Sequence, residues 1–446
     1  MSGKRLSYRD TFFLWLPLAL SWTMMSIASP VANAGIARLP DPEVNLAAHG
    51  LTMSIAVLVE SPIIMILSTS VSLVRSRQSY LLLRRFVTHL SIVLTIIGAC
   101  VYFTPLYDVL FRRLMGVPVE VAEAARPAMR VLLLWPAAIG WRRLYQGILI
   151  RRGQSKLVSF GTVFRLAALT LTVAAGVALR LSPGAVVGGL AMAVSVVVEM
   201  LVIAWWTRPV VRNEVLPVAQ DPDSVQPLDY AGLLRFYLPL AGTDAMRVLS
   251  RPITTTGIAR APQATLSLAT WPVAYGLSWL LSASIMALQE VVVARMGDEE
   301  SRRHLRTFSV AAGLGMTALL GLSVATPTAG WYYRELLGVP PDVEALALSN
   351  LAYMLPLPLL IAGRSFLRGV LISRRETGLV QQGMFINLLS LVLLLVIGAR
   401  WGVLQGVTVA VLATMLAELV EIVALWLLSR RQAEPQAEPE ASPVLQ

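Results

Sequence analysis

Three charged residues interrupt an otherwise apolar stretch near the middle of the chain: Asp244, Arg247 and Arg251. Spacings of three and four residues place them on one face of an α-helix. Arg251 precedes Arg260 by nine residues, which corresponds to about 13 Å along a helix. A guanidinium group can donate two parallel hydrogen bonds to a carboxylate or a phosphate. This face therefore predicts either an anion-binding site in a water-filled cavity or an internal salt bridge between Asp244 and Arg247.

Further arginines lie inside another apolar stretch. Arg364 precedes Arg374 by ten residues, about 15 Å along a helix, and Arg368 follows Arg364 by one turn. An unpaired charge at that depth in a bilayer costs at least about 2.5 to 3.5 kcal/mol, so each needs a partner or water. We expect a cationic lining around a central cavity, supplemented by neutral donors. The expected substrate-binding residues are Arg247, Arg251, Arg364, Arg368, Thr254, Thr255 and Asn33.

Two carboxylates could take part in ion coupling, because ionisable groups within a membrane mark substrate and proton pathways. Glu60 lies in an apolar stretch, and Asp244 shares its helical face with the two arginines. Glu60 could equally be the structural partner of an arginine. The chain contains three histidines and one cysteine, and we find no phosphate-binding loop, metal-ligand motif or nucleophile motif. We expect no enzymatic activity, no metal and no cofactor.

The composition is that of a polytopic membrane protein. Hydrophobic residues make up 56% of the 446 residues, charged residues make up 14%, and the mean hydropathy is +0.68. Soluble domains carry about 25% charged residues. Apolar stretches of about 20 residues can cross a bilayer as helices, and their continuous apolar character excludes a barrel. The sequence predicts twelve such helices, at 12–36, 46–74, 86–110, 127–149, 157–179, 184–207, 233–259, 264–294, 307–330, 346–372, 379–399 and 403–429.

An internal repeat divides these helices into two sets of six. The peptide Gly-Ile-Ala-Arg occurs at 35–38 and again at 257–260, an offset of 222 residues. The same offset aligns Leu-x-Gly-Val-Pro at 114–118 with its copy at 336–340. An even number of helices in each unit predicts two copies with the same orientation, related by an axis along the membrane normal. The predicted fold is therefore all-α, with two parallel six-helix repeats.

Four intramembrane charges are shared between the repeats: Arg142 corresponds to Arg364, and Glu199 corresponds to Glu421. Because both copies keep both signs, we predict structural or gating ion pairs between the fourth and sixth helix of each repeat. Direct contact with substrate or protons is the alternative. The charges of the Arg247 and Arg251 face are not shared, since the first copy has Met25 and Ser29 at those two positions.

Arginine distribution predicts the orientation of the chain. Basic residues gather on the side of the spans that carries both termini, which predicts cytoplasmic termini in an inner or plasma membrane. The net charge of +11 reflects this excess and a surface that touches anionic lipid, not a nucleic-acid partner. We expect a monomer. The expected divisions are a cytoplasmic N-terminal tail (1–11), a first bundle (12–208), a polar linker (209–232), a second bundle (233–430) and a disordered tail (431–446).

Several short stretches resemble those of a known family. They include Asn33-x-Gly35-Ile36-Ala37, Gly50-Leu51-x-x-Ser54, Arg247-x-x-Ser250-Arg251-Pro252-Ile253, Ala269-Thr270-x-Pro272-Val273, Gly147-Ile148-Leu149 and the Gly338-Val339 region. With the six-plus-six layout, the chain resembles the multidrug/oligosaccharidyl-lipid/polysaccharide exporter (MOP) superfamily, which includes the MATE transporters. Within it, the chain resembles the progressive ankylosis (ANK) membrane protein family. The similarity runs from about residue 12 to about residue 430.

This resemblance implies a secondary transporter that exports small polyanions of the citrate, pyrophosphate and nucleotide class. Arg247 and Arg251 stand at positions where the family has basic residues. Drug exporters of the superfamily use an acid in the first helix for cation coupling, and residues 12–37 contain none. We expect alternating access by rocking of the two bundles, with proton or sodium as the coupling ion. The alternatives are a flippase for an anionic lipid-linked precursor and a drug or cation antiporter that uses Glu60 or Asp244.

Overall fold

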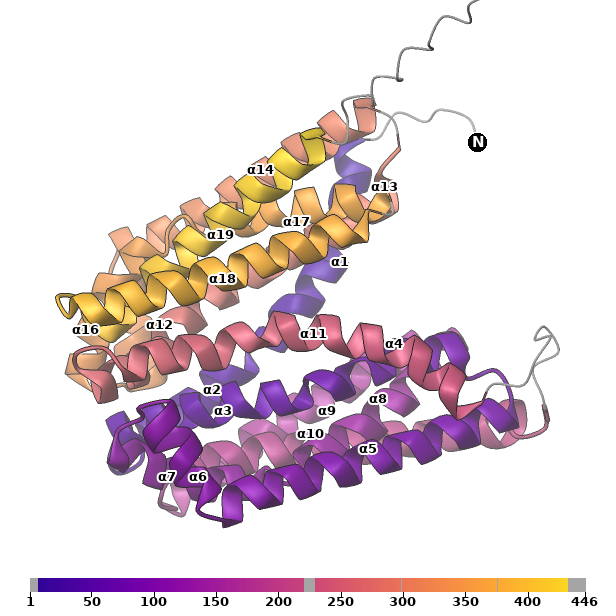
Figure 1. Ribbon diagram of the computed structural model, residues 1–446, viewed down its shortest axis with the longest axis horizontal. Coiled ribbons are helices and arrows are strands. Elements are labelled where there is room, and N and C mark those ends of the chain that lie inside the picture. The colour runs from indigo at the N-terminus through magenta and orange to yellow at the C-terminus, as the bar shows by residue number, and fades with distance from the viewer. Residues whose placement is uncertain (1–6, 220–228, 298, 375, 432–446) are drawn as a thin grey trace, which may run out of the picture.

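The computed structural model describes residues 7–219, 229–297, 299–374 and 376–431, and all regular structure in these ranges is helical (Figure 1). Parts of three sequence-based expectations lie outside the described residues: the start of the N-terminal tail, residues 220–228 of the linker and nearly all of the C-terminal tail. The described part of the linker is partly helical, since a short π-helix, η2 (Val211–Val215), extends the last helix of the first repeat.

The first repeat forms six spans, three of which consist of two consecutive helices. In chain order they are α1 (Tyr8–Ser26) with α2 (Ala28–Ala37), α3 (Pro42–Ile64) with α4 (Ile66–Leu73), α5 (Arg77–Phe103), α7 (Val119–Val131) with α8 (Trp135–Arg151), α9 (Ser155–Ala178) and α10 (Gly184–Val210). Between α5 and α7 lie α6 (Leu106–Asp108) and the π-helix η1 (Val109–Leu114).

The second repeat has the corresponding six spans. They are α11 (Tyr230–Ala259), α12 (Ala264–Ser282) with η3 (Ala283–Met286) and α13 (Ala287–Arg295), α14 (Glu299–Ala325), α16 (Pro341–Tyr353) with α17 (Leu357–Ser373), α18 (Thr377–Trp401) and α19 (Gly406–Arg431). Between α14 and α16 lie α15 (Thr328–Trp331) and the π-helix η4 (Tyr332–Leu337), the counterpart of η1.

Among the described residues, nine of these spans are long and apolar enough to cross a membrane. The pair α16 and α17, bent by 49°, makes a tenth. The two remaining spans of the predicted twelve, α7 with α8 and α11, carry several arginines each. The prediction of an all-helical, two-repeat membrane fold is confirmed.

Prolines account for three of the helix breaks. A proline ring clashes with the carbonyl group four residues earlier and cannot donate to it. Pro30 therefore disrupts the helix at Ser26, where α1 ends, and Pro136 disrupts it at Leu132, just after α7. Pro356 acts on Ala352 in the last turn of α16. Each break allows the two segments of one span to pack against different neighbours.

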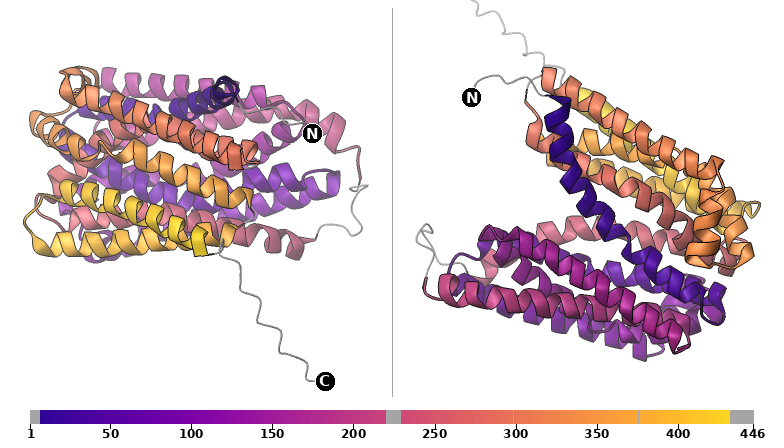
Figure 2. Two further views of the ribbon diagram at one scale, coloured as in Figure 1. Left: turned by 90° about the horizontal axis from the view of Figure 1, so that it is seen from above. Right: turned by 180° about the vertical axis from the view of Figure 1, so that it is seen from behind.

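The two repeats form two helical layers that converge at one end and diverge at the other (Figure 1). We call the divergent end the linker end, because α1 begins, α10 ends and α11 begins there. The helix α1 crosses from one layer to the other (Figure 2), and α11 lies between α3 of the first repeat and α18 of the second (Figure 1). The Trp15 indole of α1 donates a 3.0 Å hydrogen bond to the Ser284 carbonyl of the second repeat. The Tyr237 hydroxyl of α11 donates to the Pro62 carbonyl of the first repeat.

Candidate functional site

A buried ion pair joins the fourth and sixth spans of the first repeat. Arg142 of α8 donates to the Glu199 carboxylate of α10, and both side chains are almost completely buried. The Gln146 amide, one turn further along α8, donates a 3.0 Å hydrogen bond to the other carboxylate oxygen of Glu199. Every charge in this group is compensated, so the arrangement suits a structural joint between α8 and α10.

The second repeat contains a doubled version of this joint. Arg364 of α17 donates to Glu418 of α19, and Arg368 donates to Glu421 through both Nε, at 2.7 Å, and Nη2. Arg368 occupies the repeat position of Gln146, and Glu418 occupies that of Val196. Arg364 and Arg368 are thus engaged by carboxylates. This placement does not support their expected role as free cations that contact substrate.

On the charged face of α11, Arg247 is paired with an acidic residue, whereas Arg251 is not paired among the described residues. Asp244 is buried, accepts a 2.9 Å hydrogen bond from Nε of Arg247 and lies 2.7 Å from its Nη2 in an ion pair. The Arg247 side chain remains 50% exposed. Arg251, one turn further on, is exposed and has no hydrogen bond or ion pair among the described residues. Tyr275 of α12, Arg247 on the same helix and Glu60 of the first repeat are within its electrostatic reach.

Glu60 is the centre of a second uncompensated group. Its carboxylate is buried in α3 and has no hydrogen bond or ion pair in the part of the chain that the structure describes. The charges that act on it are those of Arg142, Arg143, Arg165 and Arg251. The first three belong to the first repeat, whereas Arg251 belongs to α11 of the second. The position of α11 therefore places a residue of the second repeat within electrostatic reach of Glu60.

We define the central cationic site by Glu60, Arg143, Arg165 and Arg251. Arg142 is excluded because Glu199 neutralises it. Arg143 has only a neutral partner, the Gln146 amide oxygen at 3.3 Å, and Arg165 has none among the described residues. Three guanidinium groups without an acidic partner are thus within electrostatic reach of one carboxylate. Such an excess of one sign within a membrane-spanning bundle is unfavourable unless anions or water compensate it.

Sequence reasoning missed Arg165 and Glu418. Arg165 lies in the middle of α9, within an apolar stretch, and its repeat counterpart is Asn387. A charge present in only one copy was the signal that identified Arg251, and the same comparison would have found Arg165. Glu418 lies one turn from Glu421 in α19 and could have been identified as a second partner for the arginines of α17.

An aromatic stack lies beside Arg251. Trp271, Tyr275 and Trp279 follow one another at four-residue spacing on α12, with ring centroids 4.9 and 5.9 Å apart and nearly parallel planes. Each of the three side chains is partly exposed. Tyr275 is within electrostatic reach of Arg251 and Arg364. The first repeat has His49, Met53 and Val57 instead, so the stack and the arginines of α11 both occur only in the second copy.

The neutral donors expected at the site are engaged elsewhere. Thr254 and Thr255 are buried, and their hydroxyls donate to the Ser250 and Arg251 carbonyls of their own helix at 2.9 and 3.1 Å. Asn33 is buried at the contact of α2 with α12, where its amide donates to the Pro272 carbonyl at 3.4 Å. These three residues contribute to packing in this conformation.

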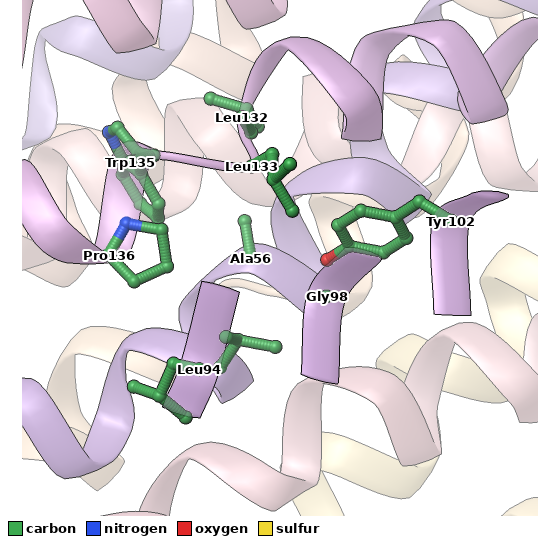
Figure 3. A pocket seen from close by; sticks show the side chains of 9 residues that line it. Ala56, Leu94, Gly98, Tyr102, Leu132, Leu133, Trp135 and Pro136 are labelled. Carbon is green, nitrogen blue, oxygen red and sulfur yellow. The ribbon is translucent and has the colours of Figure 1, made fainter. Parts of the chain in front are cut away.

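The pocket in Figure 3 lies within the first repeat and differs chemically from the cationic site. Its lining residues come from α3, α5, the break between α7 and α8 and the start of α8, and none of them is charged. They are Ala56, Val59, Leu94, Gly98, Tyr102, Leu132, Leu133, Trp135 and Pro136. This pocket does not suit an anion.

No protein-family model and no curated protein matches the chain. Among solved structures, the chain is similar to an inward-facing multidrug resistance MATE family transporter of the MOP superfamily, with a TM-score of 0.67 and 18% identity over 94% of this chain and 99% of that chain. It is also similar to the lipid II flippase MurJ in an inward closed conformation, with a TM-score of 0.72 and 13% identity over 93% of this chain and 87% of that chain.

A third similar structure is a MOP superfamily transporter from Pyrococcus furiosus, described as having a binding pocket of reverse polarity. Its TM-score is 0.62, with 17% identity over 96% of each chain. The three likenesses extend over nearly the whole chain and include transporters and a flippase. Membership of the progressive ankylosis family stays a prediction. The chain has the MATE-like helical fold that these structures share.

Proposed function

We propose that the protein is an alternating-access transporter of small organic or phosphorylated anions. The observation that carries this proposal is the excess of guanidinium groups in the central cationic site, where Arg143, Arg165 and Arg251 outnumber Glu60. Arg251 is exposed and without a partner among the described residues, so its fork can bind a carboxylate or a phosphate. Glu60 competes with the substrate for the same arginines, which makes it our candidate for proton coupling.

The experiment is uptake of labelled citrate, pyrophosphate or nucleotide into proteoliposomes that contain the purified protein. We expect uptake of at least one of these anions, and no uptake of organic cations. The absence of uptake or binding for every tested anion would contradict the proposal. A dependence of uptake on a proton or sodium gradient would identify the coupling ion, and Glu60→Gln should remove that dependence if the ion is a proton.

A flippase for an anionic lipid-linked precursor is the second candidate, because the same guanidinium groups suit an anionic headgroup. The likeness to a flippase fold is compatible with it. Scrambling of a fluorescent anionic lipid in the same proteoliposomes, without uptake of soluble anions, would favour this candidate. A drug or cation antiporter is less well supported, because Asp244 is already bound by Arg247 and Glu60 is within electrostatic reach of four arginines.

Arg247→Ala should have a small effect on transport, a decrease of no more than about fivefold, because Asp244 already compensates the charge of Arg247. The same variant should lower thermal stability, since Asp244 would remain buried without its partner. Asp244→Asn in the Arg247→Ala background should restore much of that stability. Initial uptake rates and melting temperatures of the three proteins measure both effects. A loss of uptake as large as that of Arg251→Ala would show that Arg247 itself binds the anion.

Tyr275→Leu should raise the KM for the transported anion by about threefold to tenfold. The substitution removes both stacking contacts of Tyr275, with Trp271 and with Trp279, and each such contact contributes about 0.5 to 1.5 kcal/mol. The ring wall beside Arg251 would then be less ordered. Tyr275→Phe keeps the rings and should leave KM within about twofold of the original. Equal KM values for the Leu and Phe variants would contradict a role for the stack.

A further inference from the structure

The two repeated sequence motifs meet each other across the two repeats. Arg38, at the end of α2, donates hydrogen bonds to three consecutive backbone carbonyls of η4 in the second repeat. The acceptors are Leu337 at 2.8 Å, Leu336 at 2.8 Å and Glu335 at 3.0 Å. A fourth bond, to the Ala34 carbonyl at 2.7 Å, holds the guanidinium against its own helix. We call this contact the Arg38 clasp.

The reciprocal contact, the Arg260 clasp, is made by the second copy. Arg260, at the end of α11, donates to the Leu114 carbonyl at the end of η1 in the first repeat. Arg260 is the repeat counterpart of Arg38, and Leu114 is that of Leu336. The two clasps are therefore the same contact made twice in opposite directions, from the first repeat to the second and from the second to the first.

Glycines complete both clasps. Gly338 and Gly116 follow the two π-helices with φ angles of +72° and +74°, which favour glycine. A Cβ atom at Gly338 would lie 3.3 Å from Cζ of Arg38, and one at Gly116 would lie 3.0 Å from Cγ of Arg260. Gly338 caps η4 directly and Gly116 follows one residue after the cap of η1, and each leaves room for the arginine of the other repeat.

The chemistry of the clasps is that of a cation at the carboxyl end of a helix. The last carbonyl groups of a helix have no partner within it and form its negative pole. An arginine fork supplies charge-assisted hydrogen bonds to several of them at once. Both clasps lie at the end opposite the linker end, where the two layers converge (Figure 1). A third polar link there joins Thr265 of α12 to Glu120 of α7 at 2.8 Å.

We propose that the two clasps form a gate that holds this end closed and must release before it can open. Opening would separate α2 from η4 and α11 from η1, which breaks every hydrogen bond between the repeats that Arg38 and Arg260 make. In this state the two layers are held together at the clasp end, where both clasps lie, while they diverge at the linker end (Figure 1). In this proposal Arg38 and Arg260 stabilise the state in which the clasp end is closed, and they do not bind substrate.

The test measures how fast a thiol that is buried near this end reacts with a maleimide, because the thiol becomes accessible only when this end opens. In a Cys100→Ser background, Ser267→Cys places one thiol near the start of α12, at a position that is 0% exposed. A hydrophilic maleimide is added to the purified protein in nanodiscs, so that it reaches both ends. Arg38→Ala combined with Arg260→Ala should increase the labelling rate at least about tenfold, as expected for the loss of charge-assisted hydrogen bonds from the closed state. Each single substitution should give an intermediate rate.

Two controls make the result specific. Arg113→Ala removes an exposed arginine near the same end that has no hydrogen bond among the described residues, and it should leave the labelling rate unchanged. Gly338→Ala should accelerate labelling, whereas Gly402→Ala should not. Gly402 has a similar φ of +64° but nothing within 4 Å of the added Cβ. An unchanged labelling rate in a folded double variant, or equal acceleration by both glycine substitutions, would overturn the proposal. Neither outcome depends on which substrate is transported.

Discussion

Arg251→Ala should reduce the initial rate of anion uptake into proteoliposomes by about a hundredfold. Arg251 is the arginine of the central cationic site that is exposed and lacks a partner among the described residues. Removing one partner of a desolvated, hydrogen-bonded charge pair costs about 2 to 5 kcal/mol, and each 1.4 kcal/mol corresponds to a factor of ten. The loss should appear mainly in kcat/KM, and direct binding of the labelled anion should weaken in parallel.

Arg251→Lys separates charge from geometry. Lysine keeps the positive charge but lacks the planar fork, so it should recover part of the rate and leave affinity below that of the original protein. Arg247→Ala is the matched control on the same helical face, because its charge is compensated by Asp244. Uptake by Arg251→Ala that equals uptake by the unmodified protein would eliminate the residue assignment, even if the protein transports anions.

Glu199→Ala should lower the free energy of unfolding by about 3 to 5 kcal/mol, the cost of leaving a buried charge without its partner. Arg142 would remain buried in α8, and Gln146 would lose its acceptor as well. The measurement is the free energy of unfolding in detergent micelles by denaturant titration. Replacing both partners with apolar residues, Arg142→Met and Glu199→Leu, should recover much of the loss, since the uncompensated charge is then gone.

Glu214→Ala provides the comparison for that experiment. Its carboxylate lies 3.5 Å from Nε of Arg152, and both side chains are partly exposed. Exposed ion pairs contribute about 0 to 1 kcal/mol, so Glu214→Ala should change stability by no more than that. Similar losses for Glu199→Ala and Glu214→Ala would mean that the Arg142 and Glu199 pair is reached by water and is no structural joint.

The fold could be predicted from the sequence because its determinants are local or repeated. Continuous apolar stretches indicated the spans, and the 222-residue offset aligned them into two sets of six. Helix breaks were not predicted, although Pro30, Pro136 and Pro356 mark them. The positions of α1 and α11 could not be predicted, because they depend on contacts such as that of Trp15 with Ser284, which are distant in the sequence.

The candidate site was harder to predict from the sequence than the fold. The sequence shows which residues are charged but not which acid pairs with which arginine. Arg142 faces Glu199, as the shared positions indicated, but its counterpart Arg364 faces Glu418 and leaves Glu421 to Arg368. In the sequence, an arginine that is paired with a carboxylate looks the same as one that has no acidic partner. The packing of the helices makes that distinction: Arg364 and Arg368 are paired with carboxylates, whereas Arg143 and Arg165 have no acidic partner among the described residues.

The unbroken length of α11 has a mechanical consequence. The helix runs without interruption from Tyr230 to Ala259, whereas its counterpart in the first repeat is jointed at Ile27. Arg251 and Arg260 are therefore carried by one continuous helix, about 13 Å apart along its axis. A tilt of α11 that breaks the hydrogen bond of Arg260 with Leu114 would also displace Arg251 relative to Glu60. Binding of an anion at Arg251 and release of the Arg260 clasp are thus coupled through the movement of one helix.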